Sequence, residues 1–142
     1  MHDAVPVERF LTRDEQLLAA LASIEIDKVI FTNAPREYAR RVIECLGLDA
    51  HFRMVIDLEF HGYTGKPFRE AYDRVIDHLQ VRAEECVLVE DTLRNLVVAK
   101  ELGMTTVLVG GFLDRPECVD YLVSHPSQVA ALLAELLAEP PA

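Results

Sequence analysis

The sequence predicts an α/β fold, a doubly wound parallel sheet, from two observations. Short all-apolar runs, typical of strands covered on both faces, alternate along the chain with segments of helical periodicity. Strands and helices that alternate at this spacing are typical of a parallel sheet. The 142 residues are expected to form one domain, large enough to bury about two thirds of the unfolded surface. Residues 1–11 are interpreted as an irregular segment and residues 138–142 as a frayed tail.

Composition indicates a globular chain and excludes several kinds of partner. Hydrophobic residues make up 51% of the sequence and charged residues 27%, without a low-complexity tract. The formal net charge of −10 argues against nucleic acid and against an anionic membrane as partners. No apolar run approaches the roughly 20 residues of a membrane helix, and the stretch MHDAVPVERF lacks the apolar core of a signal peptide. A cytoplasmic protein is therefore expected. Cys45, Cys86 and Cys118 share no metal-binding spacing and are expected to be buried free thiols.

The first half of the chain shows two apolar strands and two helices. Thr12 begins the sequence TRDE, which has the form of a capping box ahead of a leucine-rich helix. Residues 28–32 and residues 54–56 are all or mostly apolar and are expected to be strands. Between them, Pro35 suits the first position of a helix that ends at Gly47.

The second half continues the alternation. From Pro67 one apolar stripe predicts a helix, formed by Phe68, Ala71, Tyr72, Val75, Ile76 and Leu79. A strand at 87–89 is followed by a helix that ends at Gly103, with Leu93, Leu96, Val97 and Lys100 at helical spacing. Residues 105–109 and 119–123 are expected to be further strands. Pro126 opens a terminal helix whose inward residues are Val129, Leu132, Leu133, Leu136 and Leu137.

Two carboxylates follow the strand at 87–89. Glu90 and Asp91 lie where ligands bind in open parallel sheets, beyond the carboxyl end of a strand. Without an adjacent lysine or arginine they favour a hard divalent cation. The alternative is equally compatible with the spacing: one carboxylate caps the following helix, for which Asp91 or Thr92 is suitable, and the other is solvated.

Polar groups also follow the first strand and precede the helix at Pro67. A hydroxyl and backbone N–H groups at a helix start, here Thr32 and Asn33, can hold phosphate oxygens. Lys66 would add a cation to the same anion. Taken singly, Thr32 and Asn33 are more simply helix-capping residues, and Lys66 a solvated surface lysine. Their placement at successive strand–helix junctions favours a shared anion site.

These segments together resemble a known family. The sequences IFTNA at 30–34, GKP at 65–67, VLVEDTLRN at 87–95 and AKELGMTTVLV at 99–109 are similar to the second, third and fourth motifs of the haloacid dehalogenase-like phosphohydrolases. FTNA followed by a helix and LGL is most similar to the pyrimidine 5'-nucleotidase type. The similarity extends from about Leu11 to Leu137.

The resemblance implies a role for each matching residue. Thr32 would hold the transferring phosphoryl group, and Asn33 would help to shape its pocket. Lys66 would neutralise the phosphoryl group and the nucleophile. Asp91 would hold Mg²⁺, with Glu90 as a second ligand or an outer partner.

The chain departs from the family before Thr32. The family begins with a central strand ending in Asp-x-Asp, whose first Asp attacks phosphorus, and most of a cap domain follows; neither is found in the printed sequence. Residues 57–59, Asp-Leu-Glu, mimic the spacing but fall in the loop that leads to Lys66, so they are not favoured as the nucleophile. In the family that strand lies between the strand ending at Thr32 and the strand ending at Glu90. Either these two strands pair directly here, or another segment takes the place between them, or the sequence is a fragment with its start assigned too far downstream.

The leading interpretation is the core of a Mg²⁺-dependent phosphomonoester hydrolase acting on a small phosphorylated metabolite or nucleotide. As printed it is expected to be inactive and to bind Mg²⁺ weakly or not at all. The alternative is a non-catalytic binding or interaction module, and a homodimer is compatible with either. A receiver domain of two-component signalling is not favoured, because its acidic pair comes first and its lysine last.

Overall fold

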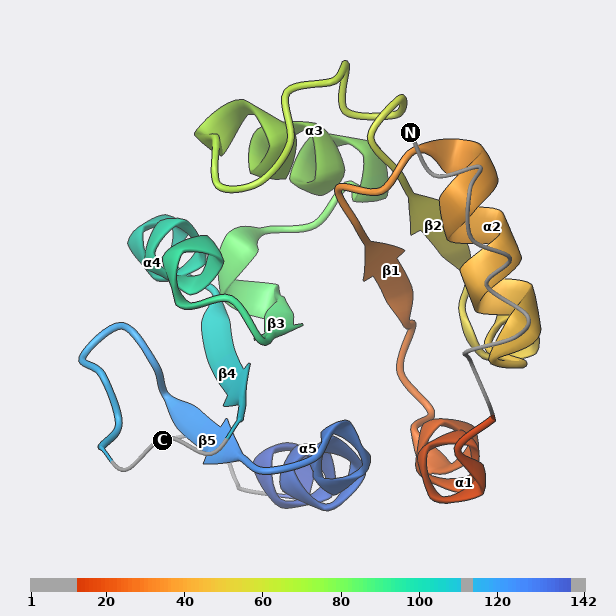
Figure 1. Cartoon of the computed structure of the whole chain (residues 1–142). Coiled ribbons are helices and arrows are strands. Elements are labelled where there is room, and N and C mark those ends of the chain that lie inside the picture. The colour runs from red at the N-terminus through yellow and green to blue at the C-terminus, as the bar shows by residue number, and fades with distance from the viewer. Residues whose placement is uncertain (1–12, 111–113, 139–142) are drawn as a thin grey trace. The chain divides into compact units, whose positions relative to one another are not determined.

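The computed structural model describes residues 13–110 and 114–138 (Figure 1). The chain divides into two compact units. The first comprises Met1–Tyr63 and Ala130–Ala142, and the second comprises Thr64–Val129. Each unit is described by itself.

The first unit is built on a pair of parallel strands. β1 (Val29–Phe31) pairs with β2 (Met54–Ile56), and the ladder continues beyond β1 because the Thr32 N–H donates to the Ile56 carbonyl at 2.9 Å. α2 (Arg36–Cys45) runs beside β2 in Figure 1. This unit also contains α1 (Glu15–Ser23), η2 (Asp49–His51) and all but the first residue of α5 (Val129–Ala138).

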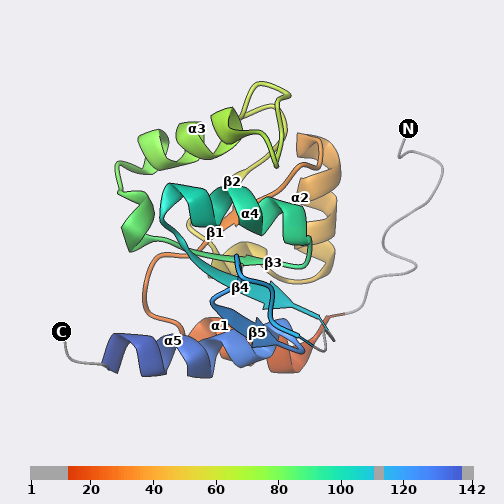
Figure 2. The same ribbon diagram turned by 90° about the vertical axis from the view of Figure 1, so that its left-hand side faces the viewer.

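The second unit is built on three parallel strands. β3 (Val87–Glu90), β4 (Thr105–Val109) and β5 (Tyr121–Val123) pair in that order. α4 (Leu93–Leu102) packs on β3 and β4, which it covers in Figure 2. The remaining elements are α3 (Arg69–Leu79), η3 (Ala83–Glu85) and η4 (Pro126–Gln128).

The core of the second unit joins α4 to its sheet. Leu96, Leu108 and Val119 are fully buried, and half-buried apolar side chains pack around them: Leu88, Leu93, Cys118 and Leu122. Burying a leucine side chain stabilises a fold by about 2 kcal/mol. This packing fixes the start of α4 against the end of β3, where Glu90 and Asp91 lie.

The predicted α/β class and the parallel pairing of strands are confirmed. Every apolar run interpreted as a strand forms one, although the run at 119–123 is a strand only over its last three residues. The described strands form one sheet of two strands and one of three. The prediction of a single domain that lacks its first central strand stays a prediction.

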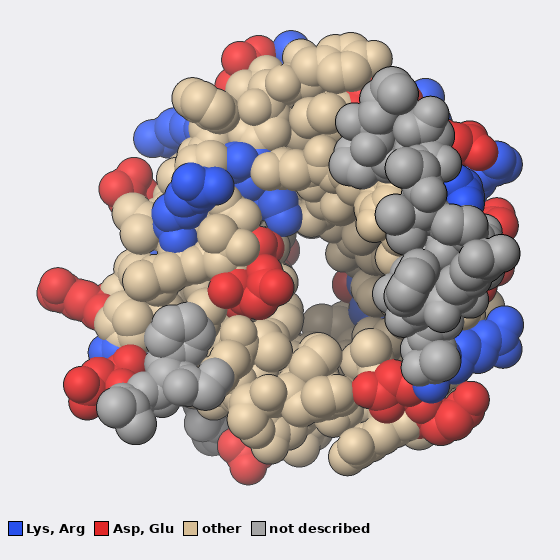
Figure 3. Space-filling view, viewed as in Figure 1, with Lys and Arg blue, Asp and Glu red and all other residues tan. Residues whose placement is uncertain are grey.

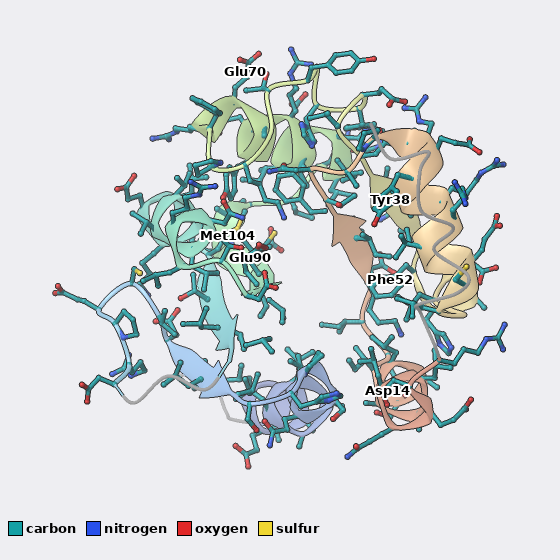
Figure 4. The ribbon with its side chains drawn as sticks, in the orientation of Figure 1. Asp14, Tyr38, Phe52, Glu70, Glu90 and Met104 are labelled. Atoms are coloured by element: carbon teal, nitrogen blue, oxygen red, sulfur yellow. The ribbon has the colours of Figure 1, made fainter. Side chains whose placement is uncertain are left out.

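The helix ends differ from expectation at two N-termini. Thr12 lies outside the described residues, and the N-cap of α1 is Asp14, whose Oδ1 accepts a hydrogen bond from the Leu17 N–H at 3.1 Å (Figure 4). Pro35 is the N-cap of α2 and not its first helical residue, since its ψ of 150° is extended. The glycine at the end of α4 is confirmed: Gly103 has a φ of +99°, which few side chains tolerate.

Some residues expected inside are exposed. Phe68 is 63% exposed because it precedes α3 as its N-cap and so lies outside the helical stripe. Leu137, in the last turn of α5, is also exposed. On α4 the buried residues are Asn95, Leu96 and Ala99, so Val97 and Lys100 lie on the outer side. The other inward predictions for α3 hold best at Ala71, Tyr72 and Val75, which are buried.

The three cysteines are free and half-buried. None of the helices in the described part of the chain has the length and apolar character required to cross a membrane.

Candidate functional site

A buried ion pair joins the loop before α3 to the end of β3. Lys66 Nζ lies 3.2 Å from Glu90 Oε2, and the two side chains are only 6% and 11% exposed. The interpretation of Lys66 as a solvated surface lysine is therefore wrong. No lysine or arginine is adjacent to the acidic pair in the sequence, but Lys66, 24 residues away, is the partner of Glu90 in the fold.

Asn95 forms a hydrogen bond with the second carboxylate oxygen of Glu90. Its Nδ2 donates to Glu90 Oε1 at 2.9 Å from the first turn of α4. Asn95 is 6% exposed, and its Oδ1 is a buried atom without a hydrogen-bond partner. A buried acceptor left unpaired costs free energy, so this oxygen is suited to receive a donor or a cation.

Tyr72, a residue of α3, forms a hydrogen bond with the same turn of α4. Its hydroxyl donates to the backbone carbonyl of Asn95 at 2.6 Å. Burial, together with the negative charge of Glu90, raises the pKa of Tyr72, which keeps the hydroxyl neutral and able to donate. Sequence reasoning missed Tyr72 and Asn95 as site residues. The available signal was a polar residue, Asn95, on the otherwise apolar inner face of α4.

Asp91 lies just before α4 and is exposed. The N-cap is Thr92, whose side chain makes no capping hydrogen bond; its Oγ1 donates instead to Asp91 Oδ1 at 3.2 Å. The alternative in which one of the two carboxylates is the N-cap of α4 is therefore wrong. Asp91 therefore lies beside the start of α4, where the first N–H groups have no partner within the helix.

The chemistry of these groups fits a hard cation. Mg²⁺ prefers oxygen ligands, and the second unit offers the carboxylate of Asp91 and the unpartnered Oδ1 of Asn95. Glu90 is already balanced by Lys66. Within residues 13–110 and 114–138 no three histidine, cysteine or acidic side chains are grouped so that they could hold a metal ion. The donor types fit Mg²⁺, but this set alone supplies few ligands.

Thr32 begins the turn between β1 and α2 in the first unit. Its Oγ1 accepts a hydrogen bond from the Ala34 N–H at 3.1 Å. The N–H of Arg36, the first residue of α2, is bonded to Glu59 Oε1 at 3.0 Å. Thr32 thus stabilises its own turn, while Glu59 caps the helix. Asn33 is exposed.

Asp57 follows β2 and binds the side chain of Arg36. Its carboxylate accepts from Arg36 Nε at 2.9 Å and from Arg36 Nη2 at 3.3 Å, and from the Phe60 N–H at 2.9 Å. Burial would raise the pKa of Asp57. The hydrogen bonds from Arg36 and Phe60 and the guanidinium charge outweigh it, so the pKa lies below its usual value. Both carboxylate oxygens are engaged, which disfavours Asp57 as a nucleophile.

Asp57 is expected to make stability depend on pH in acid. Because its folded pKa is lowered, it stabilises the fold above the unfolded pKa of about 4, and this contribution is lost as pH falls through the folded pKa. Asp57→Asn should therefore be less stable than wild type at pH 7, and the difference should shrink below about pH 4. Urea unfolding at several pH values measures it. A difference that stays constant down to pH 2 would contradict the assignment.

The candidate residues fall into two groups. Lys66, Glu90 and Asp91 belong to the second unit, where Figure 4 shows Glu90 beside the junction of β3 and α4. Thr32 and Asn33 belong to the first unit. The structure brings Lys66 and Glu90 into contact; the convergence of the two groups on one phosphate stays a prediction. On the face drawn in Figure 3, acidic and basic side chains are interspersed.

Comparison with known proteins adds a family. The model of the haloacid dehalogenase-like hydrolases matches residues 11–103. A 5'-nucleotidase of Pseudomonas aeruginosa is 26% identical over 123 residues, which is 86% of this chain and 55% of that protein. The chain thus spans about half the length of this relative.

Two solved structures show the same fold. A conserved haloacid dehalogenase-like protein of unknown function from Agrobacterium tumefaciens has a TM-score of 0.76 at 18% identity, covering 92% of this chain and 64% of that one. A HAD family hydrolase from Deinococcus radiodurans, with bound phosphate and sodium, has a TM-score of 0.68 at 24% identity, covering 90% and 60%. With the family match over well more than half of the sequence, the chain belongs to the haloacid dehalogenase-like hydrolases.

Proposed function

We propose that this chain is the motif-bearing core of a Mg²⁺-dependent phosphomonoester hydrolase. The observation that carries the proposal is the buried pair of Lys66 and Glu90, one residue before the exposed carboxylate of Asp91. A buried lysine interacts strongly with an anion because little water screens it. A lysine beside a cation-binding carboxylate is what a doubly charged phosphoryl group requires.

The family resemblance and, for Glu90, the contacts of its carboxylate indicate a division of roles. Lys66 neutralises phosphoryl oxygens, and Thr32 donates its hydroxyl to them, with Asn33 beside it in the turn. Asp91 binds Mg²⁺, which when bound neutralises and positions the phosphoryl group. Glu90 acts as the outer partner and not as a direct ligand, because its oxygens are engaged by Lys66 and Asn95.

A nucleotide is the proposed substrate class. The P. aeruginosa relative is described as a 5'-nucleotidase, and FTNA at 31–34 with the following LGL is similar to the pyrimidine 5'-nucleotidase type. Release of phosphate from a panel of nucleoside monophosphates and sugar phosphates, by a chain extended with a strand that ends in Asp-x-Asp, would test this. Hydrolysis of sugar phosphates alone would contradict it.

The 142-residue chain by itself is expected not to turn over phosphomonoesters. The residues before Thr32 contain no Asp-x-Asp, the motif whose first Asp forms the covalent intermediate in the family. The test is an assay with a generic aryl phosphate and Mg²⁺. Activity that survives repeated purification and disappears in Asp57→Asn would contradict the expectation and make Asp57 the nucleophile.

The lack of an Asp-x-Asp before Thr32 also favours a second candidate, a non-catalytic module that binds an anion. The two differ in one experiment. If a chain extended by a strand ending in Asp-x-Asp binds phosphate but does not hydrolyse any phosphomonoester of the panel, the binding module is supported. Sedimentation of the same samples would test whether the chain forms a homodimer.

A further inference from the structure

Two segments of the first unit are fastened together beside Thr32. Residues 57–61, called the clamp, contact residues 32–36, called the turn. At one end of this contact Arg36 forms an ion pair with Asp57, and the Arg36 N–H donates to Glu59 Oε1. In its middle the Leu58 N–H donates to the Ala34 carbonyl at 3.1 Å.

The other end of the contact is made by His61. Its Nε2 lies 3.1 Å from the backbone carbonyl oxygen of Thr32, and its ring meets Phe31 edge-on, with ring centroids 5.6 Å apart. A carbonyl oxygen can only accept a hydrogen bond, so Nε2 carries the hydrogen and donates it. His61 has 0% exposure, so water cannot substitute for this donor.

With His61 in place, the polar atoms of Thr32 are held on three sides. The N–H is bonded to Ile56, the carbonyl oxygen accepts from His61, and Oγ1 accepts from Ala34. The hydroxyl hydrogen is the remaining donor of this residue. The direction of this hydroxyl depends on the other three hydrogen bonds of Thr32, because they fix the backbone from which the side chain extends.

We propose that His61 is a positioning residue for the turn that begins at Thr32. By donating from Nε2 to the Thr32 carbonyl, it keeps the threonine hydroxyl in one orientation for a phosphate oxygen. His61 itself does not touch the phosphate. The part of this inference that concerns phosphate rests on the function proposed above, whereas the part that concerns the turn does not.

The test compares two replacements of His61. The amide nitrogen of His61→Gln can occupy the position of Nε2 and keep a donor, whereas His61→Leu has a similar size and no donor. Ile43→Val, at a buried position of α2 about two turns after Arg36, controls for general loss of stability. Should the leucine variant fail to fold, His61→Asn places its amide at the Nδ1 position and withdraws the donor from Thr32.

The first readout needs no ligand. Hydrogen exchange of the Thr32 and Ala34 amides, followed by NMR, is expected to quicken about tenfold in His61→Leu and to stay near wild type in His61→Gln and Ile43→Val. The second readout is the affinity for inorganic phosphate, which should fall about tenfold in His61→Leu and recover in His61→Gln. Unchanged exchange in His61→Leu, or equal effects in all three variants, would overturn the proposal.

The two readouts separate this inference from the proposed function. If wild type does not bind inorganic phosphate but only His61→Leu loses protection of the Ala34 amide, the proposed function fails and the positioning of the turn stands. If wild type binds phosphate and His61→Leu binds it equally well, the part of the inference that concerns phosphate is wrong and the proposed function stands.

Discussion

Lys66→Met is expected to lower the free energy of unfolding by about 3–5 kcal/mol. The reason is that Glu90, 11% exposed at its side chain, would be left buried with an uncompensated charge. Removing one member of a buried ion pair costs far more than the pair itself contributes. Chemical denaturation at neutral pH measures the change.

A double variant separates charge from packing. Lys66→Met combined with Glu90→Gln removes both charges, keeps similar volumes and preserves an acceptor for Asn95, so it should recover most of the lost stability. Arg69→Met, in an exposed pair with Asp73 at 3.8 Å, should change stability little. If Lys66→Met changed stability as little as Arg69→Met does, the Lys66–Glu90 pair would not be a buried pair in solution.

In a chain extended by a strand that ends in Asp-x-Asp, Asp91→Asn and Lys66→Ala should each lower kcat/KM by about a hundredfold or more. Asp91→Asn weakens binding of Mg²⁺, so part of its loss should be recovered at high Mg²⁺. Lys66→Ala leaves the phosphoryl charge unneutralised, and added Mg²⁺ should not restore it. Thr32→Val removes one hydroxyl donor and should cost less than either. Initial rates over a series of Mg²⁺ concentrations give all three values.

The control for these variants is Asp49→Asn, an exposed acidic residue of η2 with no assigned role, which should keep the full rate. If the extended chain is folded and active while Asp91→Asn and Lys66→Ala also keep the full rate, both residues must be removed from the proposed site.

The strands and most helices could be predicted because their signals are local. The apolar runs at 29–31 and 87–89 and the glycine at 103 each depend on neighbours within a few residues. Helix ends were less well predicted, since Asp14 and Thr12 are both good caps and the sequence does not choose between them.

The contacts of the site could not be predicted, because they join distant segments. Lys66 and Glu90 are separated by 24 residues, and no local pattern indicates which of the 14 basic residues lies beside Glu90. The buried position of His61 was missed for the same reason: a lone histidine in a loop carries no periodicity. The family resemblance pointed to Lys66 and Asp91, but only the folded chain shows that Glu90 is the ion-pair partner of Lys66.

The division of the chain has a consequence for the order of its folding. The contacts of the second unit join residues within 66 consecutive positions, Thr64–Val129, whereas the first unit combines residues before Thr64 with the segment that begins at Ala130. Contacts between segments that are distant in sequence form more slowly than local ones. The second unit, with its Lys66–Glu90 pair, is therefore expected to fold before the first unit is complete.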